Sequence, residues 1–201
     1  MAALLWYNKF KKDLEEIGFV FNPYDPCVAN RTVNGQQHTI VFYMDDLKSS
    51  HVDKKVNDEF ANWLEEKYGK HGKVAIHRGD KHDFLGMILD YSNSSELKID
   101  MTNYVQDMIN CFDENLKEDK ISKMPSSNDL FSDSKGPLLD DKRRELFHKI
   151  VAKGLFVSKR ARLDIHGMIS VLCTRVQQPR ESDWHKLKRL IKYLNGTKDM
   201  V

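Results

Sequence analysis

The 201-residue sequence predicts an α+β fold, and three observations support this class. Apolar residues recur at helical spacing in the first 17 residues, which indicates an amphipathic helix. Strand-forming residues flank the turn signal Asn34-Gly35, which indicates an antiparallel hairpin. After residue 140 the apolar pattern is helical throughout. We therefore expect antiparallel hairpins packed with helices, followed by a mostly helical region.

The N-terminal elements follow from local signals. Residues 5–17 carry apolar side chains on one helical face, and Gly18 supplies a C-terminal stop. Residues 27–32 and 39–43 are rich in β-branched and aromatic side chains on either side of the Asn-Gly turn, so both are predicted strands. Residues 47–50 could return as a third strand after Asp45 and Asp46.

A second helix and a second hairpin are expected next. One helical face is marked by Val52, Val56, Phe60, Trp63, Leu64 and Tyr68, with Gly69 as the stop. Residues 82–91 and 97–100 flank a polar turn, which predicts a hairpin. Thr102 is then the expected N-cap of a further helix.

The remaining chain divides in two. Residues 113–140 lose periodicity and gather charged residues, Ser, Pro and Gly, so we expect a linker or surface loop there. Beyond it, helices are expected at 141–157, at 164–177, and from Asp183 to Leu194 with Ser182 as the N-cap and Gly196 as the stop. The predicted regions are therefore 1–112, 113–140 and 141–201.

Composition restricts the functional classes. The sequence has no apolar run of the roughly 18 residues that a membrane span needs, and its first residues lack the basic start of a secretory signal. An intracellular protein is expected. Charge is uneven: residues 1–141 have 17 Lys and Arg against 25 Asp and Glu, a net −8, whereas residues 142–201 have 15 against 5, a net +10. The basic region fits phosphate binding, and it equally fits a solvated helix face.

The feature most directly tied to chemistry is Tyr43-Met44-Asp45-Asp46, at the end of an apolar strand. Two adjacent carboxylates repel each other, and a bound cation compensates that repulsion. Carboxylate oxygen is a preferred ligand of Mg²⁺, and a two-metal site about 4 Å across activates a hydroxyl nucleophile. The alternative is that Asp-Asp simply occupies a solvent-facing turn.

Several segments, in order, resemble one family. They are Leu5-Trp6-Tyr7 through Gly18-Phe19, Asp25-Pro26-Cys27-Val28, Tyr43-Met44-Asp45-Asp46-Leu47, Phe84-Leu85-Gly86-Met87, Arg160 through Ile165, and Trp184 through Thr197. In this order and spacing the chain resembles the C-terminal part of the polymerase domain of a copia-type (Ty/copia) retrotransposon reverse transcriptase, with the connection toward ribonuclease H. The resemblance implies a partial polymerase palm and the start of the thumb in residues 1–112, and a helical connection in residues 141–201.

The resemblance assigns roles to individual residues. Asp45 and Asp46 would be catalytic and would hold Mg²⁺ or Mn²⁺, with Asp45 as the main ligand. Tyr43 and Met44 would touch primer and template. Residues Phe84-Leu85-Gly86 resemble the primer grip, although an apolar strand with a glycine where another chain passes closely explains them equally well.

The basic C-terminal region would follow the nucleic acid. Lys186, Lys188 and Arg189 are expected near primer or template phosphates. The implied partners are an RNA template, a DNA primer, deoxynucleotides if the polymerase is complete, and other segments of the polyprotein. No membrane partner is expected, and the implied location is a cytoplasmic particle or the nucleus.

One departure from the family bears on activity. A copia-type polymerase has another catalytic Asp on an earlier palm strand, which would precede Met1. We therefore expect the isolated chain to lack primer extension and its palm to be poorly ordered or self-associating, because the strand bearing Tyr43 would lack a sheet neighbour. The alternative function is a non-catalytic retrotransposon remnant that binds nucleic acid or protein. An unrelated metal-dependent hydrolase that uses Asp45 and Asp46 ranks last.

Overall fold

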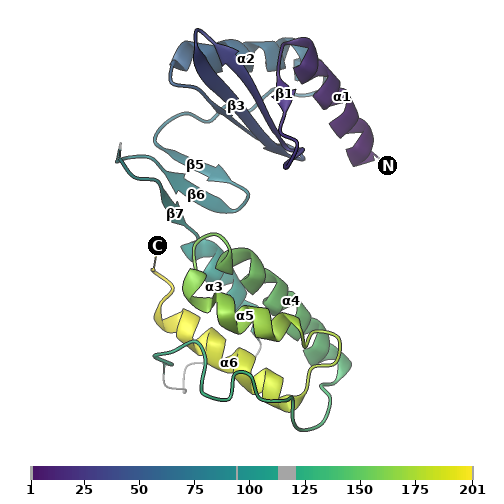
Figure 1. Ribbon diagram of the computed structural model, residues 1–201, viewed down its shortest axis with the longest axis vertical. Helices are drawn as coiled ribbons and strands as arrows, with labels where there is room; N and C mark the ends of the chain where they lie inside the picture. The colour runs from purple at the N-terminus through teal and green to yellow at the C-terminus, as the bar shows by residue number, and fades with distance from the viewer. Residues whose placement is uncertain (1, 94, 113–120, 201) are drawn as a thin grey trace. The chain divides into compact units, whose positions relative to one another are not determined.

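The computed structural model describes residues 2–93, 95–112 and 121–200, and its architecture is mixed α+β, as predicted. The chain forms two compact units, Met1–Leu85 and Gly86–Val201, each with its own elements and apolar core (Figure 1). This division falls within the predicted region 1–112. No helix in the described ranges is long and apolar enough to cross a membrane.

The first unit consists of a four-stranded antiparallel sheet and two long helices. Its elements are α1 (Ala2–Glu16), β1 (Val20–Phe21), β2 (Val28–Val33), β3 (Gln36–Tyr43), β4 (Asp46–Ser50), α2 (Lys54–Tyr68), a 3₁₀ turn (Gly69–His71) and β5 (Lys81–Phe84). The sheet order is β1-β2-β3-β4. The strand bearing Tyr43 is therefore central, paired with β2 and β4, and the expectation that it lacks a neighbour was wrong.

The local signals for these elements were mostly correct. Asn34 and Gly35 both take positive φ angles, 52° and 75°, as a two-residue hairpin turn requires, and β2 pairs with β3 from Val33↔Gln36 onward. Asp53, through its side chain, caps α2 at the Lys55 amide. Val52, expected on the apolar helix face, instead precedes the helix and is 78% exposed.

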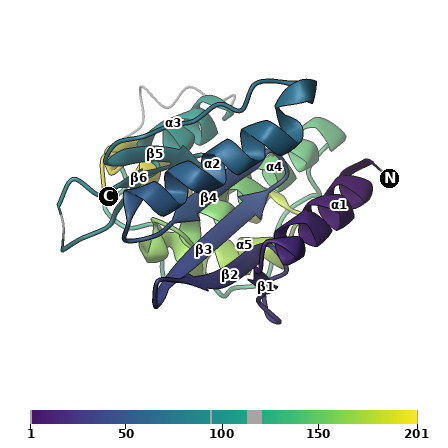
Figure 2. The same ribbon diagram turned by 90° about the horizontal axis from the view of Figure 1, so that it is seen from above.

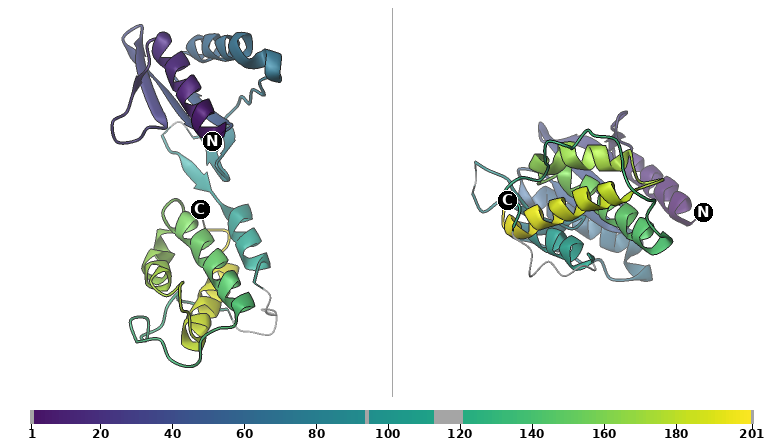
Figure 3. Two further views of the ribbon diagram at one scale, coloured as in Figure 1. Left: turned by 90° about the vertical axis from the view of Figure 1, so that its right-hand side faces the viewer. Right: turned by 90° about the horizontal axis from the view of Figure 1, so that it is seen from below.

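Both long helices cover one face of this sheet (Figures 1 and 3). Phe10 and Leu14 of α1 and Phe60 of α2 share a buried cluster with Ile40 and Phe42, which lie two residues apart on β3 and so point to the same face. Aromatic rings dominate the cluster, and Phe10 meets Phe42 edge-on at 5.0 Å between centroids. The end of β3 that leads into the following turn is thereby packed against both helices.

The second unit is mainly helical. Its elements are β6 (Met87–Asp90), β7 (Lys98–Asp100), α3 (Thr102–Asn110), α4 (Asp141–Ser158), a 3₁₀ turn (Leu163–Ile165), α5 (His166–Cys173) and α6 (Glu181–Gly196). Strands β6 and β7 pair antiparallel, which confirms the second hairpin. The predicted strand 82–91 is interrupted by a turn at Leu85-Gly86, where both φ angles are positive.

Helix boundaries in this unit depart from the sequence predictions. Thr102 is the first residue of α3 rather than its cap, and its amide donates to the Asp100 side chain at 2.8 Å. The cap of α6 is Arg180, whose amide donates to the Asp183 carboxylate, while the Ser182 hydroxyl accepts from the Lys135 amide instead. Helix α5 ends at Cys173, four residues before the predicted end.

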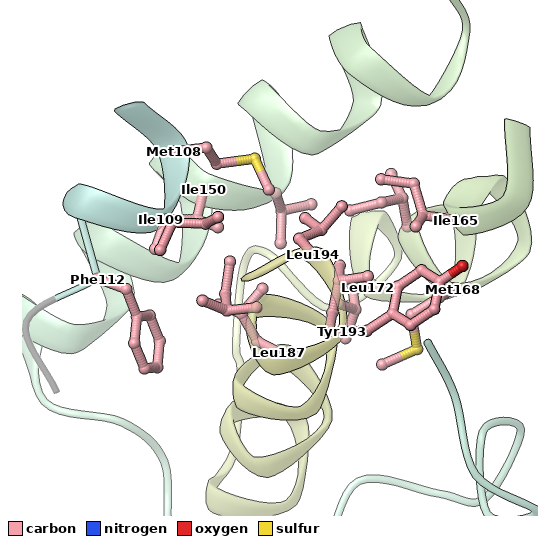
Figure 4. Close-up of a cluster of buried hydrophobic side chains, with 14 of the residues drawn as sticks. Met108, Ile109, Phe112, Ile150, Ile165, Met168, Leu172, Leu187, Tyr193 and Leu194 are labelled. Atoms are coloured by element: carbon pink, nitrogen blue, oxygen red, sulfur yellow. The ribbon is translucent and has the colours of Figure 1, made fainter. Parts of the chain in front are cut away.

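The core of the second unit lies among α3, α4, α5 and α6 (Figures 1 and 4). Leu187 and Leu194 of α6 face Ile150 of α4 and Leu172 of α5 in Figure 4, and all four are fully buried. Gly154 of α4 permits close approach of α5, because a Cβ there would lie 2.4 Å from Ile169 Cδ1. Burial of apolar side chains between the helices is the main source of stability of the second unit.

Segment 121–140, the described part of the predicted linker, is bound to α6. The Ser134 hydroxyl donates to Asp183 at 2.9 Å, and the Arg180 guanidinium donates to the Gly136 carbonyl at 2.8 Å. Leu139 is buried in the core. Residues 121–140 therefore belong to the packed second unit, and the rest of the predicted linker, 113–120, lies outside the described residues.

Candidate active site and cationic pocket

The Tyr43–Asp46 turn joins the end of β3 to the start of β4, two neighbouring strands of the sheet of the first unit (Figure 2). Tyr43 pairs with Asp46, so Met44 and Asp45 form a two-residue hairpin turn. Asp45 and Asp46 are both exposed, as are the Tyr43 and Met44 side chains at 54% and 62%. The four residues thus form an exposed turn at the end of two paired strands.

Met44 has a strained backbone. Its φ angle is 52°, a left-handed conformation that costs an unbranched L-residue about 1 kcal/mol or more. Trp6 of α1 donates its indole Nε1–H to the Met44 carbonyl at 3.3 Å, and the same ring stacks on Phe10 at 5.4 Å. A side chain of α1 therefore supports the turn, and the strained backbone of Met44 lies directly before the carboxylate pair.

No cationic side chain among the described residues pairs with the two carboxylates. Within the described residues, neither Asp45 nor Asp46 takes part in an ion pair or a side-chain hydrogen bond. Mg²⁺ in polymerase-type sites takes one or two protein carboxylates and completes its shell with water and substrate phosphates. The exposed pair fits that pattern. No group of three or more metal-binding side chains occurs in the described ranges.

A buried polar site in the same unit is centred on Asp13, a residue that the sequence analysis did not single out. Asp13 is only 7% exposed, accepts a short hydrogen bond from the Tyr68 hydroxyl, and pairs with Lys9 at 2.9 Å and Lys67 at 3.0 Å. Burial opposes ionisation, but these bonds outweigh it and lower the pKa of Asp13 to about 2. The cluster joins α1 to α2 and is structural.

A second buried group, His38 of β3, was also not anticipated. Its Nδ1 accepts from the Arg31 guanidinium at 3.2 Å, and its Nε2 lies 2.8 Å from the Ser49 hydroxyl. Burial, with the nearby Arg31 and His51 charges, lowers the pKa of His38 to about 4. The imidazole is therefore neutral at neutral pH and connects three neighbouring strands.

The predicted primer-grip residues form a tight turn. Phe84 is buried at the end of β5, and Leu85 and Gly86 follow with φ angles of 54° and 73°. A Cβ at Gly86 would lie 3.6 Å from the Tyr104 ring, an ordinary contact, so the positive φ is what favours glycine there. This geometry is a two-residue hairpin turn, and its role toward a primer stays a prediction.

The predicted phosphate contacts on α6 separate into two groups. Lys186 is 5% exposed, and its ammonium donates to the Leu130 and Ser132 carbonyls at 3.2 and 3.1 Å. It is therefore committed to binding segment 121–140. Lys188 and Arg189 instead line a pocket of about 510 Å³, together with His185 and Lys192 of α6 and Ile121, Ser122 and Lys123.

Comparison with known proteins shows similarity to a transposon protein. The chain is 26% identical over 208 aligned residues to the putative transposon Ty5-1 protein of Saccharomyces cerevisiae, and the match covers 99% of this chain. The chain spans about 62% of that protein's length. No family model and no solved structure matches the chain. The similarity supports a transposon origin for the sequence.

Proposed function

We propose that this chain is the C-terminal part of the polymerase domain of a copia-type retrotransposon reverse transcriptase. The reaction would be transfer of a deoxynucleotide to a primer 3′-hydroxyl on an RNA template. One observation carries the proposal: a strained Met44 turn holds two exposed carboxylates, Asp45 and Asp46, with no protein counter-charge among the described residues. Backbone strain that the surroundings enforce is concentrated at functional sites.

The residues of the turn would have distinct roles. Asp45 and Asp46 would hold Mg²⁺ or Mn²⁺, which when bound would activate the primer hydroxyl and stabilise the leaving pyrophosphate. Tyr43 and Met44, both exposed, would contact the primer and template beside the metal. Trp6 would act as a positioning residue, because its hydrogen bond to the Met44 carbonyl sets the orientation of the turn.

Two carboxylates are a partial ligand set for two metal ions. The proposal places the further carboxylate on a palm strand that precedes Met1, as the family resemblance implies. The 62% coverage of the yeast relative is compatible with a longer parent protein. Polymerase activity is thus proposed for the chain joined to that segment.

Primer extension tests the proposal. The chain as given should show no extension with Mg²⁺, an RNA template and all four deoxynucleotides. The chain extended at its N-terminus by the palm segment of a copia-type reverse transcriptase should extend the primer, and Asp45→Asn should abolish this activity. Asp80→Asn, which alters an exposed carboxylate elsewhere in the unit, is the matched control and should leave extension unchanged.

Two results would contradict the proposal. If the N-terminally lengthened chain extends the primer and still does so after Asp45→Asn, the carboxylate pair is not part of the polymerase site. Asp45-dependent extension by the chain as given would show that the upstream carboxylate is unnecessary.

A second candidate is a remnant that binds nucleic acid without catalysis. The cationic pocket on α6 favours it, because that pocket lies in the unit without the carboxylate pair. The sequence encoded upstream of Met1 separates the two candidates, since only a polymerase requires an in-frame segment with the further catalytic Asp.

A further inference from the structure

The pocket on α6 has two walls that are far apart in the sequence. One wall is α6, from which His185, Lys188, Arg189 and Lys192 face the cavity. These positions are i, i+3, i+4 and i+7, which form one helical face. The other wall is the segment Ile121–Lys123, so the two sides of the cavity come from residues about 60 apart.

The second wall is held by specific contacts. A Cβ at Gly196, the last residue of α6, would lie 2.2 Å from the Ile121 Cγ2 atom, so glycine is what lets Ile121 rest on the helix end. The Ser122 hydroxyl donates to the Met124 carbonyl at 2.7 Å, which closes a local turn. Farther along, Lys186 fixes Leu130 and Ser132. Lys123 thereby lines the same pocket as Lys188 and Arg189.

The described charged residues that line the pocket are all basic. Lys123, Lys188, Arg189 and Lys192 contribute positive charge, and none of the described lining residues is acidic. Asp129 feels the positive charges of Lys186 and Arg189, and its pKa is lowered first by a hydrogen bond from Ser127 and then by those charges. The buried Arg189 Nε has no hydrogen-bond partner in the described part of the chain.

We propose that this pocket is a phosphate-binding site that takes two neighbouring phosphate groups of one ligand. The cations lie on two walls and along about 6 Å of helix between Lys188 and Lys192, which is more than one phosphate needs. Among the described residues, no Phe, Tyr or Trp side chain lines the cavity for base stacking, so the recognition that we propose is by charge. The ligand is either a nucleic-acid backbone or a small polyphosphate.

This site deepens the nucleic-acid-binding candidate and requires no polymerase activity. It adds Lys123 and His185 to the predicted residues and removes Lys186, whose ammonium already has two carbonyl acceptors. Lys123 is the informative residue, because it lies outside the helix and is exposed, so its replacement leaves the core intact.

The experiment uses the full chain with two probes, tripolyphosphate by calorimetry and a labelled RNA–DNA hybrid by anisotropy over 50 to 200 mM salt. Lys123→Ala and Lys188→Ala are each expected to weaken tripolyphosphate binding about tenfold, the effect of losing one charge-assisted contact. For the hybrid, each variant should reduce the log–log salt slope by about 0.9. Lys149→Ala, an exposed lysine of α4 outside the pocket, is the charge-matched control.

The outcomes are distinct. If Lys123→Ala and Lys188→Ala weaken the binding of both probes, the pocket accepts nucleic-acid phosphates. If they weaken the binding of tripolyphosphate alone, the pocket is a site for a small polyphosphate, and the nucleic-acid candidate is removed. The proposal is overturned if neither probe binds, or if Lys149→Ala weakens binding as much as Lys123→Ala while all three variants unfold at the wild-type temperature. None of these results bears on the Asp45 test of polymerase activity.

Discussion

Two charged sites, one in each unit, have opposite environments. In the first unit, Asp45 and Asp46 lie exposed at the tip of a hairpin without protein partners among the described residues. In the second unit, Arg162 is 2% exposed and makes a bidentate ion pair with Asp164, with contacts of 3.0 and 2.8 Å. Both pairs belong to segments that resemble family motifs, so resemblance alone does not separate a chemical role from a structural one.

The Arg162 site explains two of those segments together. Its guanidinium also donates to the Thr197 carbonyl and hydroxyl at the end of α6, and the Tyr193 hydroxyl donates to Asp164 at 2.7 Å. Burial alone would raise the pKa of Asp164, but the bonds from Arg162 and Tyr193 lower it. These residues thus fasten the end of α6 to the turn before α5. The charged groups of the Arg162 site satisfy one another within the protein, which indicates a structural role.

The largest effect should follow from breaking the buried pair. Arg162→Ala removes the guanidinium donors of Asp164 and of the Thr197 carbonyl. The expected cost is about 3 kcal/mol of unfolding free energy, the lower end of the range for buried pairs, because the Asp164 side chain is 28% exposed. Urea unfolding followed by circular dichroism measures it. The control is Arg160→Ala, an exposed neighbour over the Phe156 ring. Equal losses in both variants would contradict the assigned structural role.

Mild acid should weaken the first unit selectively. The unfolded chain protonates His38 below about pH 6.5, whereas the folded chain does so only near its pKa of about 4. Stability is therefore complete above pH 6.5 and is lost as the pH falls toward 4, by about 2 kcal/mol at pH 5. Fluorescence of Trp63 and of Trp184 in single-tryptophan variants should show the first unit melting earlier at pH 5. His38→Gln should remove this dependence, and His148→Gln should not.

A smaller loss is expected at the Asp13 cluster. Tyr68→Phe removes one hydrogen bond to a buried carboxylate that keeps its two lysine partners, so the expected cost is about 1 to 2 kcal/mol. Tyr43→Phe removes a hydroxyl from an exposed ring in the same unit and should change stability by less than about 0.5 kcal/mol. Thermal unfolding at pH 7 compares them, and a similar loss in both variants would show that the bond to Asp13 is not stabilising.

The smallest effect is expected at the carboxylate pair itself. Asp45→Asn should leave the unfolding free energy of the chain within about 0.5 kcal/mol of wild type, because an exposed side chain with no partner in the described part of the chain contributes little to the fold. Urea unfolding measures this directly. A loss of unfolding free energy above about 1 kcal/mol would show that Asp45, like Asp164, stabilises the fold, and it would count against the proposed metal site.

Local sequence signals determined most of the elements. The Asn34-Gly35 turn, the strands that it joins and the hairpin that presents Asp45-Asp46 followed from turn chemistry and alternation, which act over a few neighbouring residues. The α+β class followed for the same reason. The break at Leu85-Gly86 was missed because leucine gives no signal for a positive φ angle.

Only the tertiary structure decided which charged residues are buried. Asp13 and Lys186 have the helical spacing of surface residues, yet α2 covers the first and segment 121–140 binds the second. Lys123 joins the α6 pocket because Gly196 admits Ile121 beside the helix end, a contact between residues 75 positions apart. The burial of a charge depends on which distant segment lies over it, and periodicity within one helix carries no information about that segment.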